Sequence, residues 1–82
     1  MDRINVYNLA GEYIYYGLWN STKQCSFYTL HGEYFSYGLK TGSRINIFSL
    51  NVEYISYGLF VDEKRINFFD LDANYISYGL KV

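Results

Sequence analysis

The chain repeats itself four times, and this internal repeat constrains its fold more than any other feature of the sequence. Each unit is about 21 residues long and carries the signature Tyr-Gly-Leu near its end. The signature tyrosines are Tyr16, Tyr37, Tyr57 and Tyr78. A chain of 82 residues forms one domain at most, so we expect residues 1–82 to be a single domain built from these repeats.

Each unit is predicted to be a β-hairpin, and the absence of proline and the 22% aromatic content favour strands. In the first unit, one arm over residues 4–8 leads into a turn, and a return arm follows over residues 12–19. Gly11 stands where a three-residue loop with a bulge needs a left-handed backbone conformation. Val52 stands at the same place in the third unit, so we expect that turn to have a different shape.

The alternation of side chains along the arms predicts which face of each hairpin is buried. In the third unit, a three-residue loop places Ile45 and Ile47 on the same face as Tyr57 and Leu59, and this face is apolar in all four units. The opposite face carries tyrosine, serine and asparagine, including Ser56. We therefore expect Leu59 to lie in the core and Ser56 on the other face.

The links between units contain a longer repeat. Six residues follow the first and third units, whereas five follow the second. The longer links begin with Trp19 and Phe60, and the shorter link begins with Lys40. The units therefore pair into superrepeats over about residues 1–41 and 42–82.

The end of the chain is in phase with its beginning. Continuing from Val82 into Met1 of another copy gives a link of the same length as the short one. This phase predicts a closed arrangement, which is either a ring of blades or a barrel whose last strand meets its first.

Two segments, RINFFDLDANYISYG from Arg65 and RINVYNLAGEYIYYG from Arg3, resemble the outer-strand hairpin of NHL-type β-propeller blades. The resemblance implies a four-stranded blade of about 40 residues. The chain departs from the family because it has no proline and no glycine-rich inner hairpin.

The leading prediction for the fold is all-β, with four hairpins forming two four-stranded blades of an oligomeric β-propeller. Two blades cannot close a ring, so two or three chains would have to assemble. The first alternative is an eight-stranded up-and-down barrel with the apolar face inside. An open array of hairpins is the second alternative.

Composition excludes several classes of function. A net charge of −1 provides no excess cations for a phosphate backbone, so we expect no nucleic-acid partner. One cysteine and one histidine cannot complete a zinc site, and no other cofactor is indicated. No apolar run is long enough to span a membrane and no secretory signal begins the chain, so we expect a cytoplasmic protein without a membrane partner.

Single residues that could support chemistry have simpler interpretations. His31 falls within a turn, and Cys25 takes the place of a core isoleucine in the other units. Asp70, Asp72 and Asn74 have the spacing that opens a calcium loop, but the remaining ligands are missing, so we interpret them as turn residues. Repeated surface ion pairs are expected between arginines before the first arms and glutamates after the turns. These residues are Arg3, Arg44, Arg65, Glu12, Glu33 and Glu53.

No nucleophile, base and orienting group are placed together, so we expect no enzymatic activity. The leading hypothesis is a self-associating structural or scaffold module. The alternative is a multivalent carbohydrate-binding module in which Trp19, Tyr13, Tyr34, Tyr54 and Tyr75 stack on sugar rings. We expect Trp19 to pack between blades rather than to bind a sugar.

Overall fold

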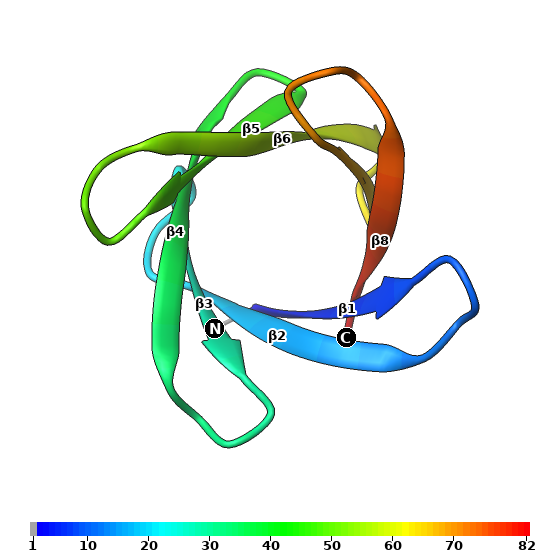
Figure 1. Ribbon diagram of the computed structural model, residues 1–82, viewed down its shortest axis with the longest axis horizontal. Helices are drawn as coiled ribbons and strands as arrows, with labels where there is room; N and C mark the ends of the chain where they lie inside the picture. Colours follow the sequence, from blue (N-terminus) through cyan, green and yellow to red (C-terminus); the bar gives the residue numbers. More distant parts are fainter. Residues whose placement is uncertain (1) are drawn as a thin grey trace.

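The computed structural model describes residues 2–82, so Met1, where the predicted junction begins, lies outside the described residues. The described chain forms eight antiparallel strands that follow one another around a closed barrel (Figure 1). The strands are β1 (Arg3–Asn8), β2 (Tyr13–Trp19), β3 (Gln24–Thr29), β4 (Tyr34–Thr41), β5 (Arg44–Ser49), β6 (Tyr54–Asp62), β7 (Arg65–Phe69) and β8 (Tyr75–Lys81).

The barrel closes within one chain because β1 pairs with β8. The Val82 amide donates a hydrogen bond to the Arg3 carbonyl at 2.9 Å beside this seam. Every strand is paired on both sides, so the four-stranded blades of the leading prediction do not form, and the barrel named as its alternative is the fold. The in-phase ends therefore meet in the same molecule. Self-association no longer follows from unpaired strand edges and stays a prediction.

The four turns share one geometry. The Gly11 amide donates to the Asn8 carbonyl at 2.9 Å, which closes a three-residue loop, and Gly11 has φ +83°. Val52 and Ala73 hold the same conformation at φ +66° and +65°. The prediction of a differently shaped third turn is wrong. The Val52 amide makes the same bond to the Ser49 carbonyl, and the pairing of the flanking strands holds the backbone there despite the β-branched side chain.

The predicted face of every return arm is also wrong, by one residue. Tyr7 pairs with Tyr13 and Val6 pairs with Tyr15, so Ile14 between them has no partner. The same unpaired residue recurs in each hairpin, as Phe35, Ile55 and Ile76. Such a β-bulge bends its strand and increases the local twist, which a small barrel needs in order to close.

Beyond each bulge, the side chains lie on the face opposite to the predicted one. In the third hairpin, Ile45 and Ile47 are buried as predicted, but they pair with Gly58 and Ser56. Leu59 instead lies on the outer wall and is 40% exposed.

The core comes from the first strand of each hairpin, and the return strand makes room for it. Within residues 2–82, eight apolar residues are buried, namely Ile4, Val6, Cys25, Phe27, Ile45, Ile47, Ile66 and Phe68. Glycine faces them from the return strands. A Cβ atom built on Gly38 would lie 2.5 Å from Ile45 Cδ1. Large side chains from one strand and small ones from the next thus fill the narrow interior.

The outer wall is covered by aromatic rings and arginines. In the third hairpin, Arg44 donates from Nη2 to the Tyr54 hydroxyl at 2.7 Å and from Nε to Asn46 Oδ1 at 2.8 Å. Its guanidinium lies 4.1 Å from the centre of the Tyr57 ring. Arg3 and Arg65 make equivalent contacts in the first and fourth hairpins. The predicted ion pairs between these arginines and the glutamates do not form in residues 2–82, because tyrosine and asparagine bind the guanidinium groups instead.

Candidate functional site: the barrel mouth

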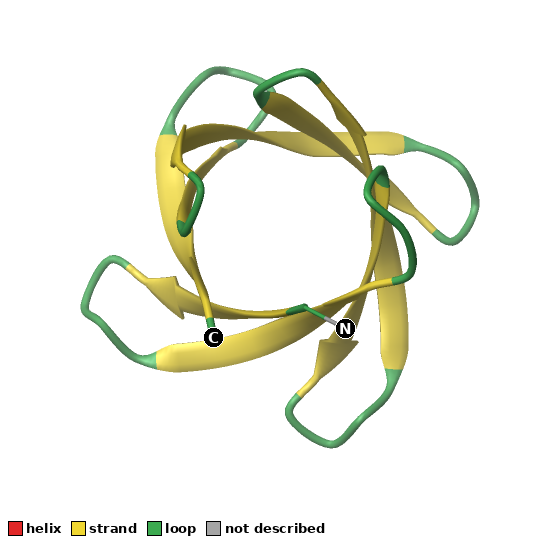
Figure 2. Ribbon diagram, turned by 180° about the vertical axis from the view of Figure 1, so that it is seen from behind, coloured by secondary structure: helices red, strands yellow, loops and turns green. Residues whose placement is uncertain are grey.

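The two ends of the barrel differ, and the end that carries the links forms an open mouth. Seen from behind, the links and the C-terminus face the reader, and the turns lie farther away (Figure 2). Each return strand sends one side chain into this mouth directly after its Gly-Leu pair. The four side chains are Trp19, Lys40, Phe60 and Lys81.

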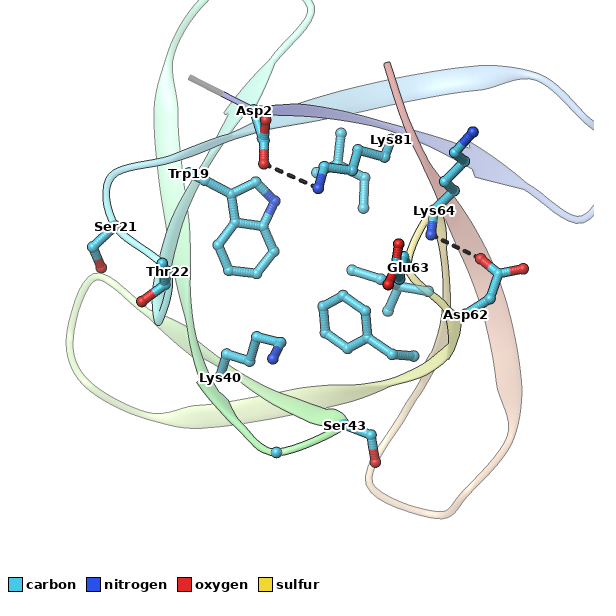
Figure 3. A pocket seen from close by; sticks show the side chains of 14 residues that line it. Asp2, Trp19, Ser21, Thr22, Lys40, Ser43, Asp62, Glu63, Lys64 and Lys81 are labelled. Carbon is cyan, nitrogen blue, oxygen red and sulfur yellow. Dashed lines mark hydrogen bonds and ion pairs between the residues drawn. The ribbon is translucent and has the colours of Figure 1, made fainter.

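The mouth alternates aromatic and basic side chains, because the 41-residue superrepeat places like residues on opposite sides. Trp19 and Phe60 approach each other across the mouth, with ring centres 6.2 Å apart and planes inclined by 41° (Figure 3). Both rings are partly buried and pack on the core. The Trp19 amide donates to the Asp2 carbonyl at 3.0 Å, and the Phe60 amide donates to the Ser43 carbonyl at 2.8 Å. Strand-like hydrogen bonds therefore anchor both aromatic residues.

A cavity of about 820 Å³ lies in this mouth. Its floor is apolar, formed by the two rings with Ile4 and Ile66. Polar residues of the links form the rim, including Ser21. The cavity has the volume and the mixed lining of a small-molecule site, which is typically 300–1,000 Å³ in size.

The charged groups of the mouth are not equivalent. Lys81 forms an ion pair with Asp2, with Nζ 3.0 Å from Oδ2. The Lys40 ammonium lies 5.1 Å from the centre of the Phe60 ring, and no carboxylate of residues 2–82 forms an ion pair with it. Asp62 accepts a hydrogen bond from the Lys64 amide at 2.7 Å, which fixes its carboxylate on the link.

Tyr15 fills the opposite end of the barrel. Serine occupies its place in the other three hairpins. Its ring makes edge contacts with Phe27 and Phe35, with ring centres 5.8 and 5.1 Å apart. Burial raises the pKa of the Tyr15 hydroxyl to about 12, and a hydrogen bond with Ser77 opposes this shift. Because Tyr15 blocks this end, a ligand would enter through the link end.

The five predicted ligand-binding residues do not come together. Trp19 ends β2 inside the mouth, whereas Tyr13 begins β2 near the turn on the outer wall. Tyr34, Tyr54 and Tyr75 occupy the same outer place in the other hairpins, and each contacts an aromatic neighbour.

Phe60, Lys40 and Lys81 share one site with Trp19, and none of the three is among the predicted ligand-binding residues. A usable signal was present, because all four follow a Gly-Leu pair and alternate in type. The propeller prediction places Trp19, Lys40 and Phe60 at the start of separate links between units, and it does not bring them into one site.

Three other residues lie where the sequence predicts. His31 is in a turn, where its amide donates to Thr29 Oγ1 at 3.3 Å. Cys25 is fully buried, and burial raises the pKa of its thiol to about 12. Asp70 caps its own turn, and hydrogen bonds from Asn74 lower the pKa of its carboxyl. Across residues 2–82, no three His, Cys, Asp or Glu side chains are grouped so that they could hold a metal ion.

Comparison with known proteins gives no match, since no protein-family model, curated protein or solved structure is significantly similar to the chain. Residues 2–82 contain no helix that is long and apolar enough to cross a bilayer.

Proposed function

We propose that the protein is a non-enzymatic binding module that holds one small molecule with a flat apolar face in the mouth of its barrel. The observation that carries this proposal is the pair of Trp19 and Phe60 at the floor of the 820 Å³ cavity. An aromatic contact contributes about 0.5–1.5 kcal/mol beyond the burial of its area, and both rings of the pair can contact one ligand.

The two aromatic side chains of the mouth are held in place without a ligand. Trp19 and Phe60 pack on the core, and the strand pairing fixes their backbones, so little side-chain entropy is lost when a ligand contacts them. The barrel excludes water from one side of each ring, and a ligand would exclude it from the other.

The lining favours binding over catalysis. The residues around the cavity include no histidine or cysteine, and the Asp2 carboxylate is held by Lys81. In residues 2–82, the hydroxyl groups of Ser21, Thr22 and Ser43 form no hydrogen bond with the carboxylates of Asp62 or Glu63, so they lack the adjacent base that would activate a nucleophile.

A sugar belongs to the proposed ligand class, because the apolar face of a pyranose ring can stack on an indole. Ser21, Thr22 and Ser43 lie around the same cavity and offer hydroxyl groups to a polar ligand. One mouth per chain provides one site, so a multivalent lectin would require several chains.

The experiment is a ligand titration followed by NMR on the indole N–H of Trp19, which is the single tryptophan of the chain. Naphthalene derivatives and methyl glycosides serve as probes. We expect a saturable shift with at least one probe class. The backbone amide of Phe60 is followed in parallel, because Trp19→Ala has no indole. Trp19→Ala should lose the shift of this amide, while Tyr34→Ala on the outer wall should keep it. If no probe of either class shifts the resonance, or if Trp19→Ala binds as tightly as the wild type, the proposal is wrong.

Self-association is a second candidate function, and exposed apolar residues at the turn end favour it. The turn leucines Leu9, Leu30, Leu50 and Leu71 are 49–55% exposed. The bulge residues Ile14, Phe35, Ile55 and Ile76 add further exposed apolar surface. A second copy could cover this end, face to face. Native mass spectrometry would detect the dimer. Substitution of the turn leucines by serine should dissociate it. A wild-type chain that stays monomeric at high concentration would contradict this candidate.

A further inference from the structure

The mouth has an approximate two-fold repeat, and one of its charges breaks the repeat. An offset of 41 residues relates Trp19 to Phe60 and Lys40 to Lys81. The same offset relates Asp2 to Ser43. The carbonyls of this last pair accept equivalent hydrogen bonds, from the amides of Trp19 and Phe60. The backbone is therefore alike on both sides, and the difference lies in the side chains.

The chain supplies an anion to one lysine and not to the other. Asp2 places its carboxylate 3.0 Å from Lys81 Nζ. On the opposite side, Ser43 stands in the place of Asp2, and no carboxylate of the described chain pairs with Lys40. Lys40 is only partly exposed, and its ammonium lies over the Phe60 ring at 5.1 Å, beside the apolar floor.

The cavity lining carries three lysines and three acidic residues, so its formal charge is zero, and the placement of these charges decides whether Lys40 can attract an anion. Asp62 uses its carboxylate to cap the link through the Lys64 amide. Glu63 and Lys64 are exposed residues of the third link, where salt screens their charges. Among the charged residues of the lining, Lys40 is the one whose charge lies over an aromatic ring of the floor.

We propose that the natural ligand of the mouth is an anion, namely a molecule with one flat apolar ring and one carboxylate. The ring contacts Trp19 and Phe60, and the carboxylate pairs with Lys40 as Asp2 pairs with Lys81. This inference rests on the proposed function and narrows it from any flat apolar ligand to a monoanionic one. A charge-assisted hydrogen bond at a partly buried lysine is stronger than one between neutral groups, so it would distinguish the acid from its neutral analogue.

Three naphthalene probes of matched size and different charge test the inference at low ionic strength. They are 2-naphthoate, the neutral 2-naphthamide and the cationic 2-naphthylmethylamine. Dissociation constants come from the Trp19 indole resonance. We expect 2-naphthoate to bind the wild type at least about fivefold more tightly than the amide, and this ratio to decrease with added salt.

Three variants locate the charge that causes the preference. Lys40→Gln should remove the preference for the acid but keep the binding of the amide. Ser43→Asp should also remove it, because an internal carboxylate would occupy Lys40 as Asp2 occupies Lys81. Lys64→Gln changes the net charge by the same amount as Lys40→Gln at the exposed rim, and it should keep most of the preference.

The outcomes separate the two proposals. Equal binding of acid and amide, tighter binding of the amine, or an unchanged preference in Lys40→Gln would overturn the anionic ligand and leave the proposed function intact. Failure of all three naphthalene probes to bind the wild type would also overturn the anionic ligand, and failure of the methyl glycosides as well would contradict both proposals.

Discussion

Substitution of Gly38 by alanine tests the interior packing of the barrel. The added Cβ would lie 2.5 Å from Cδ1 and 2.8 Å from Cγ1 of Ile45, and 3.0 Å from Cδ1 of Ile47. Ile45 is fully buried and cannot move into solvent. Overpacking of this kind costs about 1–3 kcal/mol. The total free energy of unfolding for a chain of this length is about 4–12 kcal/mol, so the loss should be easily measured.

The sign of the effect identifies the face of the strand. If Gly38 pointed to solvent, alanine would stabilise the strand by about 0.5–1 kcal/mol relative to glycine. We expect the urea midpoint of Gly38→Ala to fall by about 1–3 M, taking a denaturant slope near 1 kcal/mol/M. A midpoint that is unchanged or raised would refute the assignment of this residue to the interior.

A double-mutant cycle tests the contact itself. Ile45→Val removes Cδ1, the atom nearest to the new methyl group, and costs about 0.5–1.5 kcal/mol alone. In the Gly38→Ala background it should cost about 1 kcal/mol less, because it relieves the clash. Gly42→Ala is the control, since no heavy atom lies within 4 Å of its added Cβ and its strain comes from φ +62°. Its effect should add to that of Ile45→Val, and additivity in both cycles would contradict the proposed contact.

Phe68→Ala should cost about 3–5 kcal/mol in unfolding free energy, whereas Leu59→Ala on the outer wall should cost less than about 1 kcal/mol; equal costs would contradict the bulged register. Burial raises the pKa of the Cys25 thiol from 9.0 to about 12, so the unfolded chain loses this proton at a lower pH than the folded chain. The free energy of unfolding should therefore hold below about pH 9 and fall toward pH 12. Between pH 8 and pH 11 the urea midpoint of Cys25→Ala should decrease less than that of the wild type, and an equal decrease would refute the linkage. Arg44→Ala should cost about 1 kcal/mol by thermal unfolding, and Gln24→Ala at the equivalent place clearly less; similar losses would show that the contacts on the outer wall contribute nothing.

The repeat predicted the hairpins and the closure of the chain, because both depend on local features. Turn residues such as Asn8 and Gly11 act within a few residues of themselves, and the four hairpins form where the sequence predicts them. The phase between the last unit and the first depends only on counting residues. It correctly predicted that the final strand meets an initial strand, although the choice between blades and a barrel was made wrongly.

The register of the return arms could not be read from alternation, because the bulge adds one residue without interrupting the apolar pattern. Ile14 and Leu18 both look like core residues in the sequence, and neither is in the core. The better signal was Gly17, which recurs at the same place in every unit. Glycine inside a strand marks close approach of neighbouring atoms, and a Cβ at Gly17 would lie 2.8 Å from Cys25 Sγ.

The choice of a propeller over a barrel explains the incomplete prediction of the site. Trp19 was selected because it is the single tryptophan, but its partners depend on which fold brings the links together. The sequence already contains the alternation of Trp19, Lys40 and Phe60, and the barrel brings these residues together around one mouth. The ion pair between Asp2 and Lys81 joins the two ends of the chain, so no local pattern could have predicted it.

The closure of the barrel within one chain is the claim on which the mouth and its ligand depend, and a nuclear Overhauser experiment tests it most directly. The rings of Tyr7 on β1 and Tyr78 on β8 stack with their centres 5.5 Å apart. In a sample that mixes isotope-labelled and unlabelled chains, we expect the contact between these rings to appear only in spectra that select pairs within one chain. A contact found only between labelled and unlabelled chains would show that the terminal strands pair across molecules, and the closed barrel would be wrong.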